Sequence, residues 1–130
     1  MSEDKVKLGR WALGIREVDL YWRKGTGGSF NRAASETGIG EIAVGIDEPR
    51  WEDEVSALLH ETAEFAMYDM RRRFNPDPDY SRDHGNYLFV LTHEQFSEAM
   101  ARVAWFAASA LPRLAAVYNK EHKKKRKGHD

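Results

Sequence analysis

The alternation of apolar and polar positions divides the chain into a strand-rich first third followed by two helical segments. Apolar residues alternate loosely over residues 6–13 and 15–22, a period of two that indicates strands. They form either one long strand interrupted near Gly14 or two strands joined there. A more continuous apolar run at residues 41–47 predicts a short strand that ends before Pro49, whereas the glycine-rich residues 24–29 predict a turn.

Residues 51–74 show the period of an amphipathic helix. The apolar positions of this segment fall on one stripe, formed by Val55, Leu58, Leu59, Thr62, Ala66 and Met70. Acidic residues 52–54 occupy the expected first turn and basic residues 71–73 the last, which suits the helix dipole at both ends. The two prolines in residues 75–86 predict a polar loop after this helix.

The second helix is predicted to begin at His93. Residues 87–91 are apolar and fit either a buried strand or the lead-in to this helix, and Thr92 and Gln95 have the spacing of a capping box. The expected apolar stripe consists of Phe96, Met100, Val103, Ala104, Ala107 and Leu111. Pro112 is expected to kink or end the helix, with residues 113–118 continuing helically.

Together these elements predict one α+β domain over residues 1–118. A small, mainly antiparallel sheet from the N-terminal third would pack against two long helices. A chain of 130 residues is most simply a single domain, and its hydrophobic share of 42% is enough for a core. Residues 119–130 are expected to form a basic, disordered tail.

Composition narrows the classes of function. The chain has no Cys, which excludes disulfides, thiolate metal sites and cysteine nucleophiles. No apolar run approaches the ~20 residues that span a bilayer, and the N-terminus has no signal-peptide pattern. We therefore expect a cytoplasmic protein without membrane association.

The formal net charge of −1 conceals an acidic body and a basic tail. Six of the 20 Lys and Arg residues lie in residues 119–130, against only Glu121 and Asp130. The cluster from Lys120 to Lys127 could bind nucleic-acid phosphates in a salt-dependent, sequence-independent way. No aromatic residue follows Tyr118, so stacking on bases is not supported, and a solubilising terminus is the favoured interpretation.

The candidate chemistry lies at residues 59–65, inside the first predicted helix. His60 and Glu64 are four residues apart, so their side chains are neighbours that could bind one cation. Glu61 lies on the next face, where a general base would stand beside a metal-bound water. A catalytic zinc needs a third protein ligand; His93 is the best candidate, and His84 in the loop is a weaker one.

The same residues also have plainer interpretations. Glu61 and Glu64 could be solvated helix residues, and His60 could be a histidine at the edge of the core. The Glu61-x-x-Glu64 spacing also resembles the magnesium-binding motif of all-α nucleotide pyrophosphohydrolases. Glu94 and Glu98 are one residue too far apart for the partner motif of that family, and the N-terminal strands do not fit an all-α bundle.

The β-rich N-terminal third and the helix with Leu58-Leu59-His60-Glu61 resemble small phage and prophage proteins of the minimal-zincin type, over roughly residues 5–112. The resemblance implies a twisted sheet on an active-site helix, with His60 as a zinc ligand and Glu61 as the base. It also implies a zinc metallopeptidase-like hydrolase that acts on a protein or peptide. The family usually has a second motif His at the position of Glu64, so Glu64 and His93 as ligands are inferences from this chain alone.

The departure at Glu64 supports a second hypothesis. The chain would then be a non-enzymatic phage or prophage protein that uses the zincin-like scaffold to bind a host protein. If it derives from a phage, either function would be carried out in the cytoplasm of the bacterial host.

Overall fold

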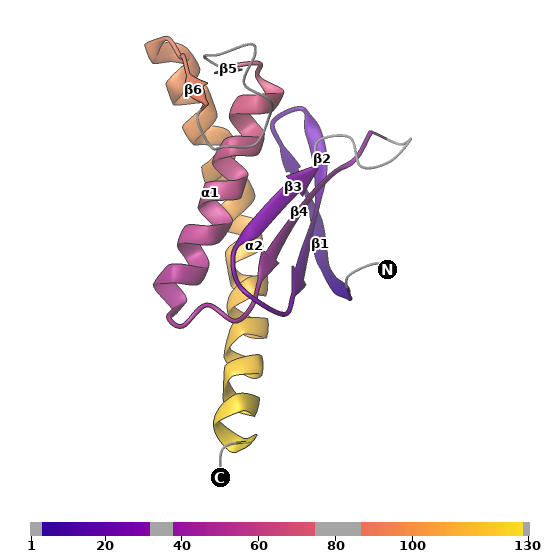
Figure 1. The fold of residues 1–130 in the computed structure, drawn as a ribbon. Helices are drawn as coiled ribbons and strands as arrows, with labels where there is room; N and C mark the ends of the chain where they lie inside the picture. The colour runs from indigo at the N-terminus through magenta and orange to yellow at the C-terminus, as the bar shows by residue number, and fades with distance from the viewer. Residues whose placement is uncertain (1–3, 32–37, 75–86, 129–130) are drawn as a thin grey trace.

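The computed structural model describes residues 4–31, 38–74 and 87–128 and confirms the predicted α+β fold (Figure 1). The elements follow one another in the order β1 (Lys5–Leu13), β2 (Arg16–Arg23), β3 (Gly28–Asn31), β4 (Gly40–Gly45), α1 (Trp51–Asp69), β5 (Arg73–Phe74), β6 (Leu88–Phe89) and α2 (His93–Gly128). The expected polar loop at residues 75–86 lies outside the described residues.

The sheet from the N-terminal third has four strands in the order β1-β2-β4-β3. β1 and β2 form an antiparallel pair, and the turn between them contains Gly14 with a φ of 68°, a conformation that glycine adopts without strain. Of the two arrangements that the sequence allows, two strands joined at Gly14 is therefore the correct one. β4 pairs parallel with β2 and antiparallel with β3, so the sheet is mainly antiparallel, as expected. β3 was not predicted, because a glycine-rich segment was expected to form only a turn.

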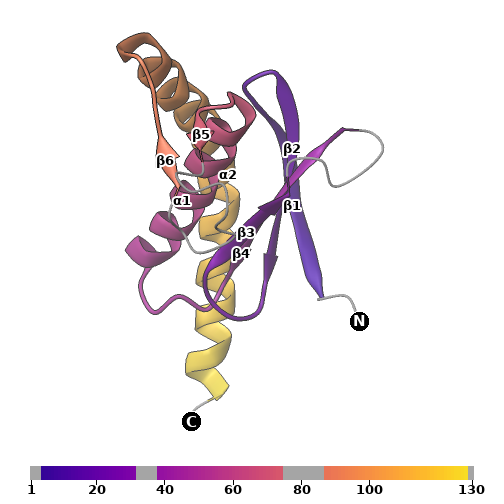
Figure 2. The same cartoon turned by 45° about the horizontal axis from the view of Figure 1, so that its top comes forward.

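Both helices pack on one side of the sheet, with α1 next to β3 and β4 and α2 next to β1 (Figures 1 and 2). The core lies between the two layers. Its largest fully buried apolar side chains are Phe65, Phe106, Leu13, Leu20, Ile42, Ile46, Leu58 and Leu114. A sheet covered by helices on one face buries alternate strand positions, which is why the period of two in the sequence identified the first two strands.

α1 begins at Trp51 as predicted, but it ends at Asp69 rather than at residue 74. Arg71 has a φ of 61°, in the left-handed region, and the amide of Arg72 donates to the carbonyl of Met67 at 2.8 Å. This is the hydrogen-bond pattern of a Schellman C-cap. The chain then reverses, and Arg73 and Phe74 pair with β6 instead of extending the helix.

The capping box at the start of α2 is confirmed. The Thr92 amide donates to the Gln95 side chain at 2.9 Å, and the Gln95 amide donates to the Thr92 hydroxyl at 3.1 Å. The strand before it, β6, is exposed, so the alternative of a buried strand at residues 87–91 is wrong.

The buried face of α2 differs from the predicted one. The buried positions are Ala99, Val103, Phe106, Ala107, Ala110, Leu114, Tyr118 and Glu121, whereas Phe96 and Met100 are half exposed and Ala104 is exposed. The predicted stripe shares only Val103 and Ala107 with this set. Apolar residues surround much of this helix, so the sequence pattern alone fits more than one buried face.

α2 also continues through Pro112 and past Tyr118 to Gly128, where a disordered tail was expected. Side chains in its last turns contact the body of the protein. His122 Nε2 lies 2.9 Å from the carbonyl oxygen of Ile46, and Lys24 forms an ion pair with Glu121 at 3.1 Å. These contacts stabilise residues 119–128 as a helix, although their sequence is distinguished only by its many basic residues. In the described part of the chain, no helix has the length and apolar character needed to cross a membrane.

Candidate functional site

The rotation of α1 about its axis decides which side chains reach the site. Leu58, Thr62, Phe65 and Ala66 are buried, and the Thr62 hydroxyl donates to the Leu58 carbonyl at 2.7 Å within the helix. Phe65 lies against Phe30 of β3, with ring centroids 5.6 Å apart. This packing leaves the predicted site residues on the side of the helix next to the buried face.

His60 and Glu64 are brought together, as their spacing predicts. His60 Nε2 lies 3.0 Å from Glu64 Oε2, and the His60 side chain is 68% exposed. The other carboxylate oxygen, Oε1, accepts a hydrogen bond from Arg73 Nη1 at 2.9 Å. Glu64 is thus held from both sides, with one oxygen on a cationic side chain and the other facing the imidazole.

Arg73 is itself fixed by aromatic side chains. Its guanidinium carbon lies 3.8 Å from the ring centroid of Tyr87 and 4.6 Å from that of Tyr68. Cation–π contacts of this kind hold an arginine where it is shielded from water on at least one side. The orientation of the Glu64 carboxylate therefore depends on the chain reversal after α1.

Glu61 points toward β3. A Cβ atom added to Gly28 would come within 2.7 Å of Glu61 Cγ, so the glycine makes room for this side chain. The Glu61 side chain is only 12% exposed, and its Oε2 lies 3.9 Å from His60 Nε2. Burial raises the pKa of Glu61; His60 lowers it and Glu64 raises it, each by a smaller amount.

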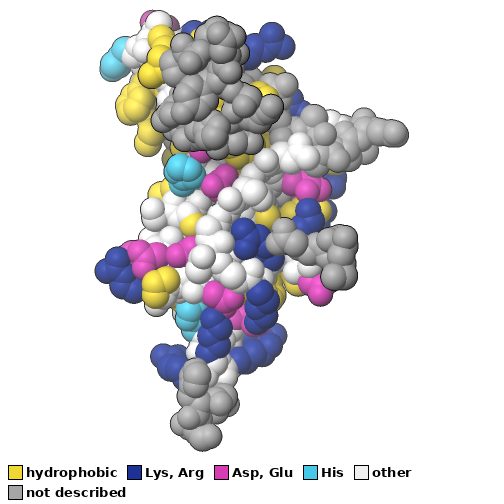
Figure 3. Space-filling model, viewed as in Figure 1, with side chains coloured by type: hydrophobic (Ala, Val, Ile, Leu, Met, Phe, Trp, Pro, Cys, Tyr) yellow, Lys and Arg dark blue, Asp and Glu magenta, His cyan; other side chains and the backbone are white. Residues whose placement is uncertain are grey.

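Two hollows meet at His60. One is open, has a volume of about 340 Å³, and lies between the β3 turn and the first half of α1. Its lining residues are Gly27, Gly28, Glu48, Asp53, Ser56, Ala57, His60 and Glu61. The other is smaller, about 120 Å³, and mostly apolar, with Met67 and Phe89 beside His60 and Glu64. His and acidic side chains lie next to each other on the α1 side of the molecule in Figure 3.

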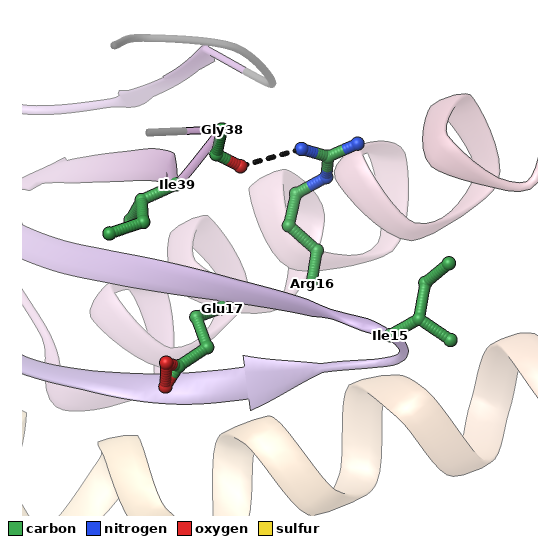
Figure 4. A pocket seen from close by; sticks show the side chains of 5 residues that line it. All are labelled: Ile15, Arg16, Glu17, Gly38 and Ile39. Atoms are coloured by element: carbon green, nitrogen blue, oxygen red, sulfur yellow. Dashed lines mark hydrogen bonds between the residues drawn. The ribbon is translucent and has the colours of Figure 1, made fainter. Parts of the chain in front are cut away.

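A third hollow lies at the turn between β1 and β2 and is drawn in Figure 4. Arg16 is its main polar group, and this guanidinium donates to the Gly38 carbonyl at 2.7 Å and to Asp69 at 3.0 Å. The Glu17 carboxylate points away from Arg16. Since Arg16 already joins two parts of the fold, this hollow has a structural explanation and we do not assign chemistry to it.

The third metal ligand stays a prediction. His93 is exposed at the first residue of α2, which begins at the end of the molecule next to β5 and β6 (Figure 1). Within residues 4–31, 38–74 and 87–128, no three His, Asp or Glu side chains are grouped so that they could hold a metal ion. His84 lies outside the described residues.

Sequence reasoning missed Arg73 and Gly28 as parts of the site. Arg73 was assigned to the last turn of the helix, and no local signal marks the reversal that returns it to Glu64. Gly28 belongs to a strand that was not predicted. Both reach the site through contacts between distant segments, which periodicity does not reveal.

No family model, curated protein or solved structure matches this chain.

Proposed function

We propose that this protein is a metal-dependent hydrolase, most simply zinc-dependent, with His60 and Glu64 as ligands and Glu61 as the general base. The observation that carries the proposal is the 3.0 Å separation of His60 Nε2 and Glu64 Oε2. Two donor atoms that each lie roughly 2.0–2.2 Å from one zinc ion are about 3–3.5 Å apart. The donor pair therefore fits a zinc ion. His93 is the proposed third ligand, although it is not grouped with these two side chains in the described residues.

Each of the three residues has a distinct task in this proposal. A bound zinc ion would supply Lewis acidity and draw the pKa of a bound water toward roughly 7. Glu64 presents one oxygen because Arg73 holds the other. Glu61 accepts a proton from water, and its raised pKa brings this carboxylate closer to the basicity that is most effective near neutral pH.

The position of β3 favours a peptide substrate. β3 is the last strand in the sheet order, and its first residue, Gly28, lines the larger hollow together with Glu61. An extended peptide can add to the edge of a sheet through its main-chain hydrogen bonds, without a requirement for particular side chains. A peptide bond bound there would lie beside the side chain of the proposed base.

Metal content tests the proposal directly. Protein purified without chelator is expected to contain about one zinc ion per chain and to unfold at a higher temperature when zinc is added. His60→Ala and Glu64→Gln should each remove the bound zinc and its stabilisation, and His93→Ala should do so if His93 is the third ligand. Glu52→Gln, an exposed change in the first turn of α1, is the matched control. A protein with no zinc by elemental analysis and no thermal response to zinc contradicts the proposal.

Glu61→Gln separates metal binding from catalysis. The variant should retain zinc, because Glu61 is not a proposed ligand, and lose peptide hydrolysis by about 10²–10⁴-fold, the usual contribution of a general base. A fluorogenic peptide library is the substrate, and Glu52→Gln again serves as the control. Unchanged hydrolysis by Glu61→Gln would eliminate Glu61 as the base.

A specific surface supports a second candidate, a non-enzymatic protein that binds another protein. Exposed apolar side chains gather on β5, β6 and the start of α2, namely Phe74, Leu88, Phe89, Val90, Phe96 and Met100. Hydrophobic side chains are visible in this region in Figure 3. Contiguous exposed apolar side chains are typical of protein interaction sites. Under this candidate, Glu61→Gln keeps the biological activity, and replacing Leu88 and Phe89 with Ser abolishes it.

Nucleic-acid binding through the basic end of α2 has less support. Lys124 forms an ion pair with Glu121 at 3.3 Å, and Lys125 with Asp47. These two cations are thus partly neutralised within the protein, which leaves fewer charges to contact phosphates.

A further inference from the structure

The side of α2 that faces away from the core is largely apolar in its middle. The core side of this helix carries Val103, Phe106, Ala110, Leu114 and Tyr118. On the opposite side, exposed residues form what we call the outer stripe: Ala101, Trp105, Ala108, Pro112 and Ala116. Trp105 is 77% exposed, although it is one of only four tryptophans in the chain. A tryptophan buries roughly 150–250 Å² when it is covered, so leaving it in water forgoes a large stabilisation.

The spacing of the outer stripe is typical of a helix that packs on another helix. Glu94, Glu98, Ala101, Trp105, Ala108 and Pro112 follow one another at intervals of four, three, four, three and four residues. This is the a/d spacing of a helix–helix seam, and here it lies on the exposed side. The small Ala side chains let a second helix approach closely, and the single large side chain, Trp105, would fill the space beside them.

Charge along the same line indicates the identity and direction of the partner. Glu94 and Glu98 precede the apolar part of the stripe, and Lys120 and Lys123 follow it, all four of them exposed. Arg102 pairs with Glu98 within the helix, so Glu94 is the more available acid. Figure 3 shows Lys and Arg side chains gathered around the C-terminal end of α2. A helix that is acidic at one end and basic at the other is complementary to a second copy of itself in the antiparallel direction.

We propose that the outer stripe is a homodimer interface, in which α2 of a second copy packs antiparallel on α2 of the first. In an antiparallel pair, contacting residues have numbers that sum to a constant. A sum near 217 joins Glu94 to Lys123, Glu98 to Lys120, Ala101 to Ala116 and Trp105 to Pro112, with Ala108 next to the two-fold axis. One register therefore satisfies the charges and the apolar positions together, and it also opposes the two helix dipoles.

A parallel pair would not have this complementarity. It would place Glu94 against Glu94 and Lys123 against Lys123, and like charges at an interface are unfavourable. A single pair of helix faces buries less than a standard interface of about 800 Å² per partner, so we expect a dimer with a Kd in the range of about 1–100 µM.

Sedimentation equilibrium between about 5 and 500 µM tests the dimer over the expected range of Kd. The wild-type protein should shift from monomer to dimer with concentration. Trp105→Glu should weaken association at least about tenfold, because it places a charge in the centre of the interface. Ile15→Glu changes another exposed apolar residue, which is 93% exposed in the turn between β1 and β2 and is not part of the outer stripe, and it should leave the dimer intact. Circular dichroism confirms that both variants are folded. A wild-type protein that remains monomeric at the highest concentration overturns the proposal.

The direction of the helices is tested by cross-linking, which is simple because the chain has no native cysteine. Under mild oxidation, a mixture of Ala101→Cys and Ala116→Cys chains should form a disulfide-linked pair of unlike chains. Each variant alone should remain mostly monomeric on a non-reducing gel. If Ala101→Cys cross-links with itself as readily as with Ala116→Cys, the antiparallel arrangement is wrong.

Discussion

Glu54 is an acidic side chain in the interior of the protein. It is fully buried, and among the described residues neither of its carboxylate oxygens has a hydrogen-bond partner. Burial raises its pKa to about 7, and the nearby carboxylates of Glu48 and Asp47 also raise it. The sequence pattern identifies Glu54 only as one of the acidic residues that favour the start of a helix, and its burial follows from tertiary packing.

The raised pKa of Glu54 predicts how stability changes with pH. In the pH range from about 4.5 to about 7, the native state holds the proton more tightly than the unfolded state does, so the free energy of unfolding falls as pH rises. Glu54→Gln removes the titrating group and keeps its shape. We expect this variant to be more stable than the wild type at pH 8, by about 1–3 kcal/mol, and to differ little near pH 4.5.

Urea unfolding at the two pH values measures this difference. Glu52→Gln, an exposed change in the same turn of α1, is the matched control and should have little effect at either pH. The raised pKa of Glu61 acts in the same direction, so a smaller pH dependence should remain in the Glu54→Gln variant. An equal effect of Glu54→Gln at both pH values would mean that its charge is not the cause.

At the scale of the element, the end of α1 shows how a helix can stop without the usual sequence signal. The Schellman cap places Arg71 in the left-handed region, where glycine is the common residue. The basic residues 71–73 instead resembled a favourable last turn, which is why the helix was predicted to continue to residue 74. The chain reversal that follows is what returns Arg73 to Glu64.

Replacing Arg71 with Gly should therefore stabilise the protein. Glycine removes the steric cost of the left-handed conformation but has more freedom in the unfolded state, so we expect a net gain of about 0.5–1 kcal/mol. Arg71→Ala, which retains a Cβ atom, is the matched comparison and should give no gain. Thermal and urea unfolding measure the effect, and equal stability of the two variants would show that the backbone conformation of residue 71 is not limiting.

The sequence located the start of both helices but not the buried face of α2. Local signals located both N-termini, since Pro49 and the acidic first turn mark α1 and the reciprocal bonds of Thr92 and Gln95 mark α2. The buried face of α2 was predicted wrongly, because exposed apolar residues such as Phe96, Met100 and Ala104 fit a helical period as well as the true core positions do. If the outer stripe binds a second copy, α2 is covered both on its core side and on its outer stripe. A helix with two covered sides is not expected to show one apolar side and one polar side.

At the scale of the whole molecule, the sequence predicted the layers but not the contacts between distant segments. Alternation predicted β1 and β2, a short apolar run predicted β4, and the i, i+4 spacing predicted that His60 and Glu64 meet. The pairing of β3 with β4 and the return of Arg73 to the site depend on tertiary structure. A local sequence pattern carries no information about contacts between distant segments. For this reason the third zinc ligand, His93, could be proposed only because histidine is a common zinc ligand.

Side chains near the C-terminal end of α2 contact residues that lie more than 60 positions earlier in the sequence. The Tyr118 hydroxyl donates to the carbonyl of Glu48 at 2.9 Å, and His122 Nε2 lies 2.9 Å from the carbonyl oxygen of Ile46. These two contacts stabilise the segment that connects β4 to α1. A protein truncated after Tyr118, where the sequence pattern places the end of the domain, would lose the His122 contact with Ile46. The helix that carries His60, Glu61 and Glu64 would then lose part of the support at its entrance.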